Sequence, residues 1–77
     1  MGKLPKITGE QLLKVLLKQG FEVSRQRGSH VQVRKFINGK KVTFPIPVHK
    51  GKTLKPGLLR GILRKADISI DDLIEKL

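Results

Sequence analysis

Asn38 and Gly39 separate two stretches in which apolar and polar residues alternate. A type I′ turn requires positive φ at both of its central positions, and Asn-Gly is a favoured pair there. Before the turn, Val31 and Val33 face one side of a strand that the alternation predicts over residues 30–36. The sequence therefore predicts an antiparallel hairpin at the centre of the chain.

The strand that follows this turn carries two prolines. Its apolar face is predicted to consist of Val42, Phe44, Ile46 and Val48. Pro45 and Pro47 fall on the opposite face, and neither has an N–H to donate to a neighbouring strand. Because proline within a sheet is found at edges or bulges, we expect an edge strand or a strand that frays beyond Phe44.

A helix is predicted before the strands. Thr8 followed by Gln11 is a capping-box pattern, and Gly20 is expected to end the helix in a left-handed conformation. Apolar residues recur between them at helical spacing: Leu12, Leu13, Val15, Leu16 and Leu17. The period then changes to two, which indicates a short first strand over residues 21–24 with residues 25–29 as its turn.

Two further helices are predicted after the strands. Pro56 suits the first turn of a helix, and Ser69 with Asp72 repeats the capping pattern before a short last helix. The buried stripe of the first of these helices is expected to comprise Leu58, Leu59, Ile62, Leu63 and Ala66. The predicted fold is a single α+β domain over residues 1–77, in the order α-β-β-β-α-α. The helices should cover one face of a three-stranded antiparallel sheet and leave the other face exposed.

The composition limits how such a domain can be stabilised and where it works. The chain has 77 residues and no cysteine, so it has room for one core and can use neither disulfides nor thiolate-bound metal. No apolar stretch approaches the roughly 20 residues that span a bilayer, and the N-terminus lacks the apolar run of a signal peptide. We therefore expect a cytoplasmic protein with no membrane partner.

Positive charge dominates the chain. Lys and Arg number 17 against 6 Asp and Glu, for a net charge of +11, and residues 23–66 contain no carboxylate. A polyphosphate partner explains this charge because cations that neutralise phosphates release counterions. An anionic membrane is a rival partner, but no segment combines these cations with an exposed bulky apolar face. A basic surface that serves only solubility is the third interpretation.

Most kinds of catalytic site are missing from the sequence. The chain has no P-loop, HExxH or CxxC motif, and its expected binding face has no carboxylates to hold a divalent ion, so we expect neither metal nor cofactor. Histidine exchanges protons most readily near neutral pH, and the chain has two, His30 and His49.

His30 follows Arg27, Gly28 and Ser29, and Arg34 is predicted to lie on the same strand face. An imidazole there could take the proton from a ribose 2′-hydroxyl while the cations hold the phosphate, which would leave a 2′,3′-cyclic phosphate. His30 could equally be a phosphate contact only. His49, between prolines and a Lys-Gly-Lys loop, is the weaker candidate.

Several motifs, taken in order, resemble the HicA toxins of bacterial and archaeal toxin–antitoxin systems. They are Leu4-Pro5-Lys6-Ile7-Thr8-Gly9, Gly20-Phe21, Arg25-Gln26-Arg27-Gly28-Ser29-His30, Val42-Thr43, Pro47-Val48-His49, Leu59-Arg60 and Ile62-Leu63. The resemblance implies a double-stranded-RNA-binding-like fold, ribosome-independent mRNA cleavage and neutralisation by a HicB antitoxin. It places the catalytic histidine at His30. Two features depart from the family pattern: residues 44–48 look longer than the usual strand ending, and Asp67 stands where glycine is usual.

The expected function is therefore that of a metal-independent mRNA endoribonuclease, a toxin with His30 as its general base or acid. The residues expected to bind RNA or its phosphates are Arg25, Arg27, Gly28, Ser29, Gln32, Arg34 and Lys41. Two alternatives stay open. One is a non-catalytic RNA-binding module of the same fold. The other is a basic subunit whose charge complements an acidic protein partner.

Overall fold

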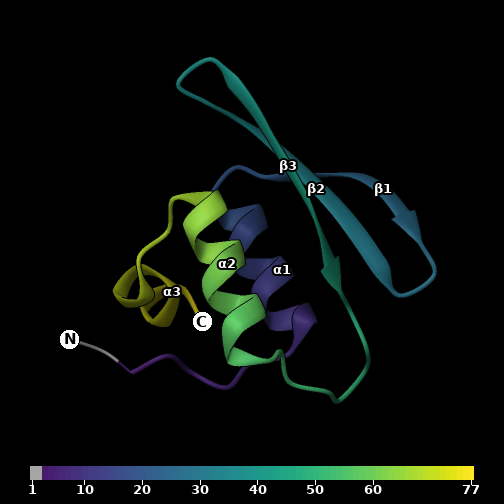
Figure 1. Ribbon diagram of the computed structural model, residues 1–77, viewed down its shortest axis with the longest axis vertical. Coiled ribbons are helices and arrows are strands. Elements are labelled where there is room, and N and C mark those ends of the chain that lie inside the picture. The colour runs from purple at the N-terminus through teal and green to yellow at the C-terminus, as the bar shows by residue number, and fades with distance from the viewer. Residues whose placement is uncertain (1–2) are drawn as a thin grey trace.

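A computed structural model describes residues 3–77 of the chain. The elements are α1 (Gly9–Lys18), β1 (Glu22–Arg27), β2 (His30–Ile37), β3 (Lys40–Pro47), α2 (Pro56–Ala66) and α3 (Ile70–Lys76) (Figure 1). This order confirms the predicted α+β arrangement. The three helices lie on one side of the sheet, and the tip of the β2–β3 hairpin extends beyond them (Figure 1).

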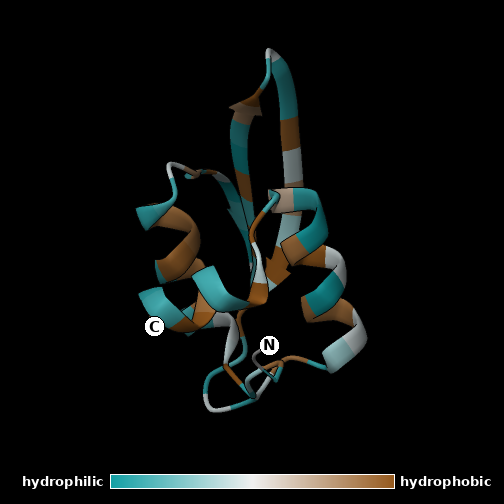
Figure 2. Ribbon diagram, turned by 90° about the vertical axis from the view of Figure 1, so that its left-hand side faces the viewer, coloured by the Kyte–Doolittle hydropathy of each residue, from teal (hydrophilic) through white to brown (hydrophobic). Residues whose placement is uncertain are grey.

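The β2–β3 hairpin has the turn that the sequence predicts. Asn38 has a φ of 52° and Gly39 a φ of 80°, as a type I′ turn requires. The two strands pair without interruption from Ile37 opposite Lys40 to His30 opposite Pro47. Hydrophilic and hydrophobic bands alternate along both strands (Figure 2). The hairpin therefore separates a face that packs against the helices from an open face.

The strand with the prolines is an edge strand, as one of the two alternatives predicted. β2 lies between β1 and β3 in the sheet, and pairing with β3 continues through Pro47, so the strand does not fray beyond Phe44. Past Pro47, the N–H of Val48 donates to the Ser29 carbonyl at 2.6 Å. Backbone groups alternate in direction along a strand, so the nitrogens of Pro45 and Pro47 point away from β2. Neither proline removes a hydrogen bond from the sheet.

The first strand is longer than predicted, because it runs over Glu22–Arg27 rather than residues 21–24. Its turn comprises only Gly28 and Ser29, and Gly28 has a φ of 58°. The register of β1 on β2 shifts between Val23 and Arg25, which is a β-bulge. The extra residue breaks the two-residue alternation, and this is why the sequence pattern predicts an end of the strand at residue 24.

Apolar residues of the sheet and the helices form one core. The sheet contributes Val31, Val33, Phe44 and Ile46, all of them buried as predicted. The helices contribute Leu12, Val15, Leu16, Leu59, Ile62, Leu63, Ala66 and Leu73. Two residues predicted in the buried stripes are instead exposed, Leu17 at 45% and Leu58 at 42%. Each lies at the margin of its helix's apolar stripe, on the side turned away from the core.

The helix ends follow the predicted chemistry. Thr8 Oγ1 accepts from the Gln11 N–H at 3.2 Å, and the Thr8 N–H donates to Gln11 Oε1 at 2.9 Å, which completes the capping box. Ser69 Oγ accepts from the Asp72 N–H at 3.1 Å. Asp67 ends α2 in the left-handed conformation, with a φ of 58°. Glycine adopts this conformation without steric cost, so the aspartate at this position is held in a conformation that L-residues rarely adopt.

Leu59 and Leu58 are neighbours on α2 that test the orientation of this helix. Leu59 is 1% exposed, so Leu59→Ala should leave a cavity and lower the free energy of unfolding by about 2–5 kcal/mol. Leu58→Ala should lower it by less than about 1 kcal/mol, because that side chain is largely in solvent. Urea denaturation of both variants measures the difference. Equal effects would contradict the packing of α2.

Candidate nucleic-acid interface

One set of polar and basic side chains shares the open face of the sheet. Residues directly opposite one another in an antiparallel pair project to the same face. Arg27 lies opposite His30, Arg25 opposite Gln32, and Glu22 opposite Arg34. On the other side of β2, Thr43 lies opposite Arg34 and Lys41 opposite Phe36. Together with Pro45 and Pro47, which lie opposite Gln32 and His30, the open face therefore comprises Glu22, Arg25, Arg27, His30, Gln32, Arg34, Phe36, Lys41 and Thr43.

The β-bulge brings two arginines to this face. Strict alternation from Val23, which lies opposite the buried Val33, would turn Arg25 and Arg27 toward the helices. The extra residue, Ser24, shifts the alternation by one position, and its hydroxyl donates to the Gln32 carbonyl at 3.2 Å. Both arginines are exposed. The bulge thus adds two positive charges on the His30 side of the sheet.

Arg34 occupies a different environment from the one predicted for it. Its Nε donates to Glu22 Oε1 at 2.8 Å in an ion pair whose side chains are 44% and 65% exposed. Arg34 lies four positions after His30 along β2, so the two residues are about 13 Å apart at the usual strand rise. The open face also carries this one carboxylate, contrary to the expectation of none. Arg27, and not Arg34, is the arginine next to His30.

The remaining predicted contacts spread over the open face and its turn. Gln32 Nε2 donates to Thr43 Oγ1 at 3.1 Å, which orients both side chains. Lys41 is exposed at the far end of the hairpin, beside Phe36, whose ring is 68% exposed. Gly28 and Ser29 form the turn next to His30, and an added Cβ at Gly28 would meet no atom within 4 Å. This turn is open to solvent at Gly28.

The structure brings the two histidines together. The ring centroids of His30 and His49 are 6.4 Å apart, with the ring planes at 81°, and both side chains are exposed. Pairing of His30 with Pro47 and the Val48–Ser29 hydrogen bond set this spacing. The sequence made His49 the weaker candidate because it lies between prolines and a Lys-Gly-Lys loop, where ligand contact or solvation explains it equally well. The signal that could have paired them is the register from the Asn-Gly turn, which sets residue 47 opposite residue 30.

The loop that carries His49 is tied down at several points. The Lys52 N–H donates to the His49 carbonyl at 3.1 Å, and the Leu54 N–H donates to the Ile7 carbonyl at 2.8 Å. The start of α1 lies against the end of β3, where a Cβ added to Gly9 would clash with the Pro47 carbonyl oxygen. Only glycine fits between the two backbones, so α1 holds the end of β3 in place.

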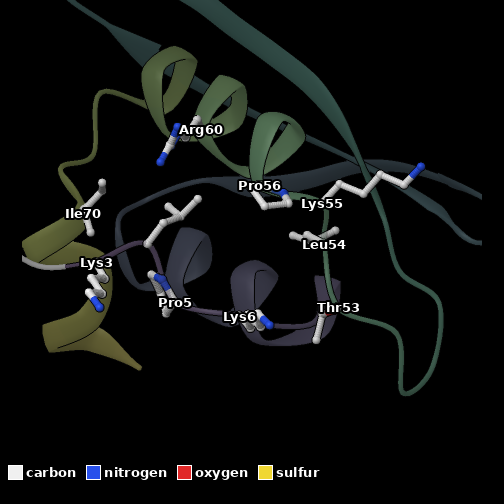
Figure 3. A pocket seen from close by; sticks show the side chains of 10 residues that line it. Lys3, Pro5, Lys6, Thr53, Leu54, Lys55, Pro56, Arg60 and Ile70 are labelled. Carbon is white, nitrogen blue, oxygen red and sulfur yellow. The ribbon is translucent and has the colours of Figure 1, made fainter.

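Two hollows border this loop. A pocket of about 220 Å³ opens beside His49 and is lined by Pro47, His49, Lys52, Thr53, Leu54, Lys55 and Leu58. A second hollow, of about 530 Å³, lies where the N-terminal segment, the loop and α2 meet (Figure 3). Its cations are Lys3, Lys6, Lys55 and Arg60. Neither histidine lines this second hollow, whereas His49 lines the smaller pocket.

Within residues 3–77, no three His, Asp or Glu side chains gather into a group that could hold a metal ion. Among those residues, no helix is long and apolar enough to cross a membrane.

The fold and the site define a class of protein: a small basic α+β domain that presents cations and His30 on the open face of a three-stranded sheet, with His49 close to His30. The chain matches the family described as the HicA toxin of bacterial toxin–antitoxin over residues 9–68, and it belongs to that family. It is thus a toxin of a toxin–antitoxin system, and toxins of this family are generally RNases. The match includes both histidines. No curated protein and no solved structure is significantly similar to the chain.

Gly9 tests whether the contact between α1 and β3 is as close as described. Gly9→Ala should destabilise the fold by about 1–3 kcal/mol, because the new methyl group would displace the Pro47 carbonyl. Gly61→Ala is the matched control: it lies inside α2, an added Cβ meets no atom within 4 Å, and alanine should stabilise the helix by about 0.5–1 kcal/mol. Thermal melting of both variants distinguishes them. A Gly9→Ala protein as stable as the parent would contradict this contact.

Proposed function

We propose that the protein is a metal-independent endoribonuclease that cleaves mRNA with His30 as its general base. The observation that carries the proposal is the position of His30 on the open face, directly opposite Arg27 and exposed to solvent. A base beside a cation is the minimum that RNA cleavage needs, because the ribose supplies the nucleophile. The membership of a family of toxins that are generally RNases supports the same activity.

The reaction begins when a nitrogen of His30 takes the proton from a ribose 2′-hydroxyl. The 2′-oxygen attacks the adjacent phosphorus, and the bond from phosphorus to the 5′-oxygen breaks. The 5′-oxygen leaves with the electron pair of that bond and takes a proton from solvent or an acidic group, so the products are a 2′,3′-cyclic phosphate and a fragment with a 5′-hydroxyl. Negative charge grows on the phosphate oxygens during this step, and nearby guanidinium groups stabilise it. DNA has no 2′-hydroxyl and should resist cleavage.

The predicted RNA-binding residues have different distances from the reacting phosphate. Arg27 is opposite His30 and Arg25 is the next residue of β1 on the same face, so these two serve the scissile phosphate. The backbone of Gly28 and Ser29 borders the same site. Gln32, Arg34 and Lys41 follow along the hairpin and contact neighbouring nucleotides. Phe36, exposed beside Lys41, offers an aromatic surface on which a base can stack.

A HicB-type antitoxin is the proposed protein partner. The family implies an antitoxin, and the basic surface of the chain is complementary to an acidic partner. Because the toxin would act on mRNA, we expect the toxin and its antitoxin in the cytoplasm. A basic subunit held by an acidic protein and an RNase are therefore compatible descriptions of the same toxin.

His30 distinguishes cleavage from binding. His30→Ala should abolish RNA cleavage in EDTA, because no base is left to activate the 2′-hydroxyl. The variant should melt near the parent temperature, since the side chain is exposed, and should still bind 2′-O-methyl RNA, which cannot be cut. If the parent binds RNA but does not cut it in EDTA, the protein is a non-catalytic RNA-binding module. Cleavage by the variant at the parental rate would also refute the proposed base.

The open face predicts a salt-dependent affinity for RNA. Each phosphate that the protein neutralises in single-stranded RNA contributes about −0.7 to the slope of log affinity against log salt. Arg27→Ala and Arg25→Ala should each reduce the slope by up to about that amount. Lys76→Ala, at the end of α3, should leave it unchanged. Titration of 2′-O-methyl RNA at several salt concentrations measures the slopes, and an equal effect of Lys76→Ala would place the binding face elsewhere.

A further inference from the structure

We propose that His49 is a second catalytic residue, the general acid that protonates the leaving 5′-oxygen. The inference rests on the proposed ribonuclease function and adds a group to its site. The ring centroids of the two imidazoles are 6.4 Å apart, and the ring planes lie at 81° in an edge arrangement. Hydrogen bonds from ring nitrogens to phosphodiester oxygens measure about 2.8 Å, so the two rings are close enough for one phosphodiester to contact both.

The spacing of the two rings is a property of the fold. His30 begins β2, and His49 follows the two residues that close the β2–β3 pairing, Pro47 and Val48. The hydrogen bond from the Lys52 N–H to the His49 carbonyl turns the chain directly after the ring. A pair of groups held at a fixed separation before substrate arrives lowers the entropy cost of the reaction.

The surroundings of the two rings differ, and this difference indicates which imidazole is the base and which is the acid. His30 shares the open face with Arg27, whereas His49 lines the pocket of about 220 Å³. Lys52 and Lys55 give this pocket positive charge, and Leu54 and Leu58 give it apolar surface. Cations next to apolar surface suit a nucleotide, with its phosphate and its base. An RNA strand that lies along the open face and continues into this pocket places its leaving nucleoside on the His49 side.

The exposure of Leu58 fits this assignment. Leu58 is 42% exposed on a helix whose other large apolar residues are buried, so it contributes little to the core. It does form part of the pocket wall. The pocket therefore gives a role to a side chain that the helical pattern predicted to be buried.

The complete step balances with two imidazoles. Neutral His30 accepts the 2′-hydroxyl proton, the 2′-oxygen forms a bond to phosphorus, and the 5′-oxygen leaves with the electron pair of the broken bond. Protonated His49 gives its proton to that oxygen. The products are the 2′,3′-cyclic phosphate and the 5′-hydroxyl, with His30 protonated and His49 neutral, and exchange with water restores both rings.

A change of leaving group tests the role of His49 directly. The probe is an RNA oligonucleotide in which sulfur replaces the 5′-bridging oxygen at a mapped cleavage site, because a thiolate leaves without needing a proton. His49→Ala should slow cleavage of the ordinary RNA by about 10²- to 10⁴-fold, the usual range for a lost general acid. The same variant should cut the sulfur substrate within about tenfold of the parental rate. His30→Ala should lose activity on both substrates, since each still needs a base.

Lys50→Ala is the control, because it removes a positive charge next to His49 without removing an imidazole. It should change both rates alike and leave their ratio at the parental value. A His49→Ala variant that is slow on both substrates, or that cuts ordinary RNA at the parental rate, would overturn the assignment. If the His30→Ala variant instead cut the sulfur substrate near the parental rate, His30 would be the acid, and this result would also overturn the assignment. A parent protein that cuts neither substrate would instead refute the ribonuclease function itself.

Discussion

The register of β2 on β3 is the constraint on which the rest of the structure depends. It starts at the Asn38-Gly39 turn and continues without a shift to the pair of His30 and Pro47. On one face it places Val31, Val33, Phe44 and Ile46 in the core. A slip by one residue would exchange the two faces, so the same register that builds the core also keeps His30 in solvent.

The β-bulge in β1 places two further positive charges on the open face, near His30. A regular strand would turn Arg25 and Arg27 to the helix side of the sheet, away from His30. The extra residue at Ser24 instead places them on the open face, opposite Gln32 and His30. Of the open-face cations, Arg34 has a carboxylate partner in Glu22. The arginines near His30 are therefore those best placed for an anionic ligand.

The sequence predicted the elements well and the three-dimensional neighbours less well. The capping box at Thr8, the turn at Asn38 and the start of α2 at Pro56 depend on residues close together in the chain, and all three are confirmed. The bulge was not predicted, because a single extra residue resembles the end of a strand. The approach of His49 to His30 requires the register across a complete hairpin. A local pattern with two prolines did not determine that register.

The chemistry of the ends left by RNA cleavage tests the central claim most directly, namely that an imidazole on the open face activates the 2′-hydroxyl. Mass spectrometry of RNA incubated with the purified protein in EDTA identifies these ends. The geometry predicts 2′,3′-cyclic phosphates together with 5′-hydroxyls, because the nucleophile belongs to the substrate. Fragments with 3′-hydroxyl and 5′-phosphate ends would show that water attacks the phosphorus, and they would contradict the role given to His30.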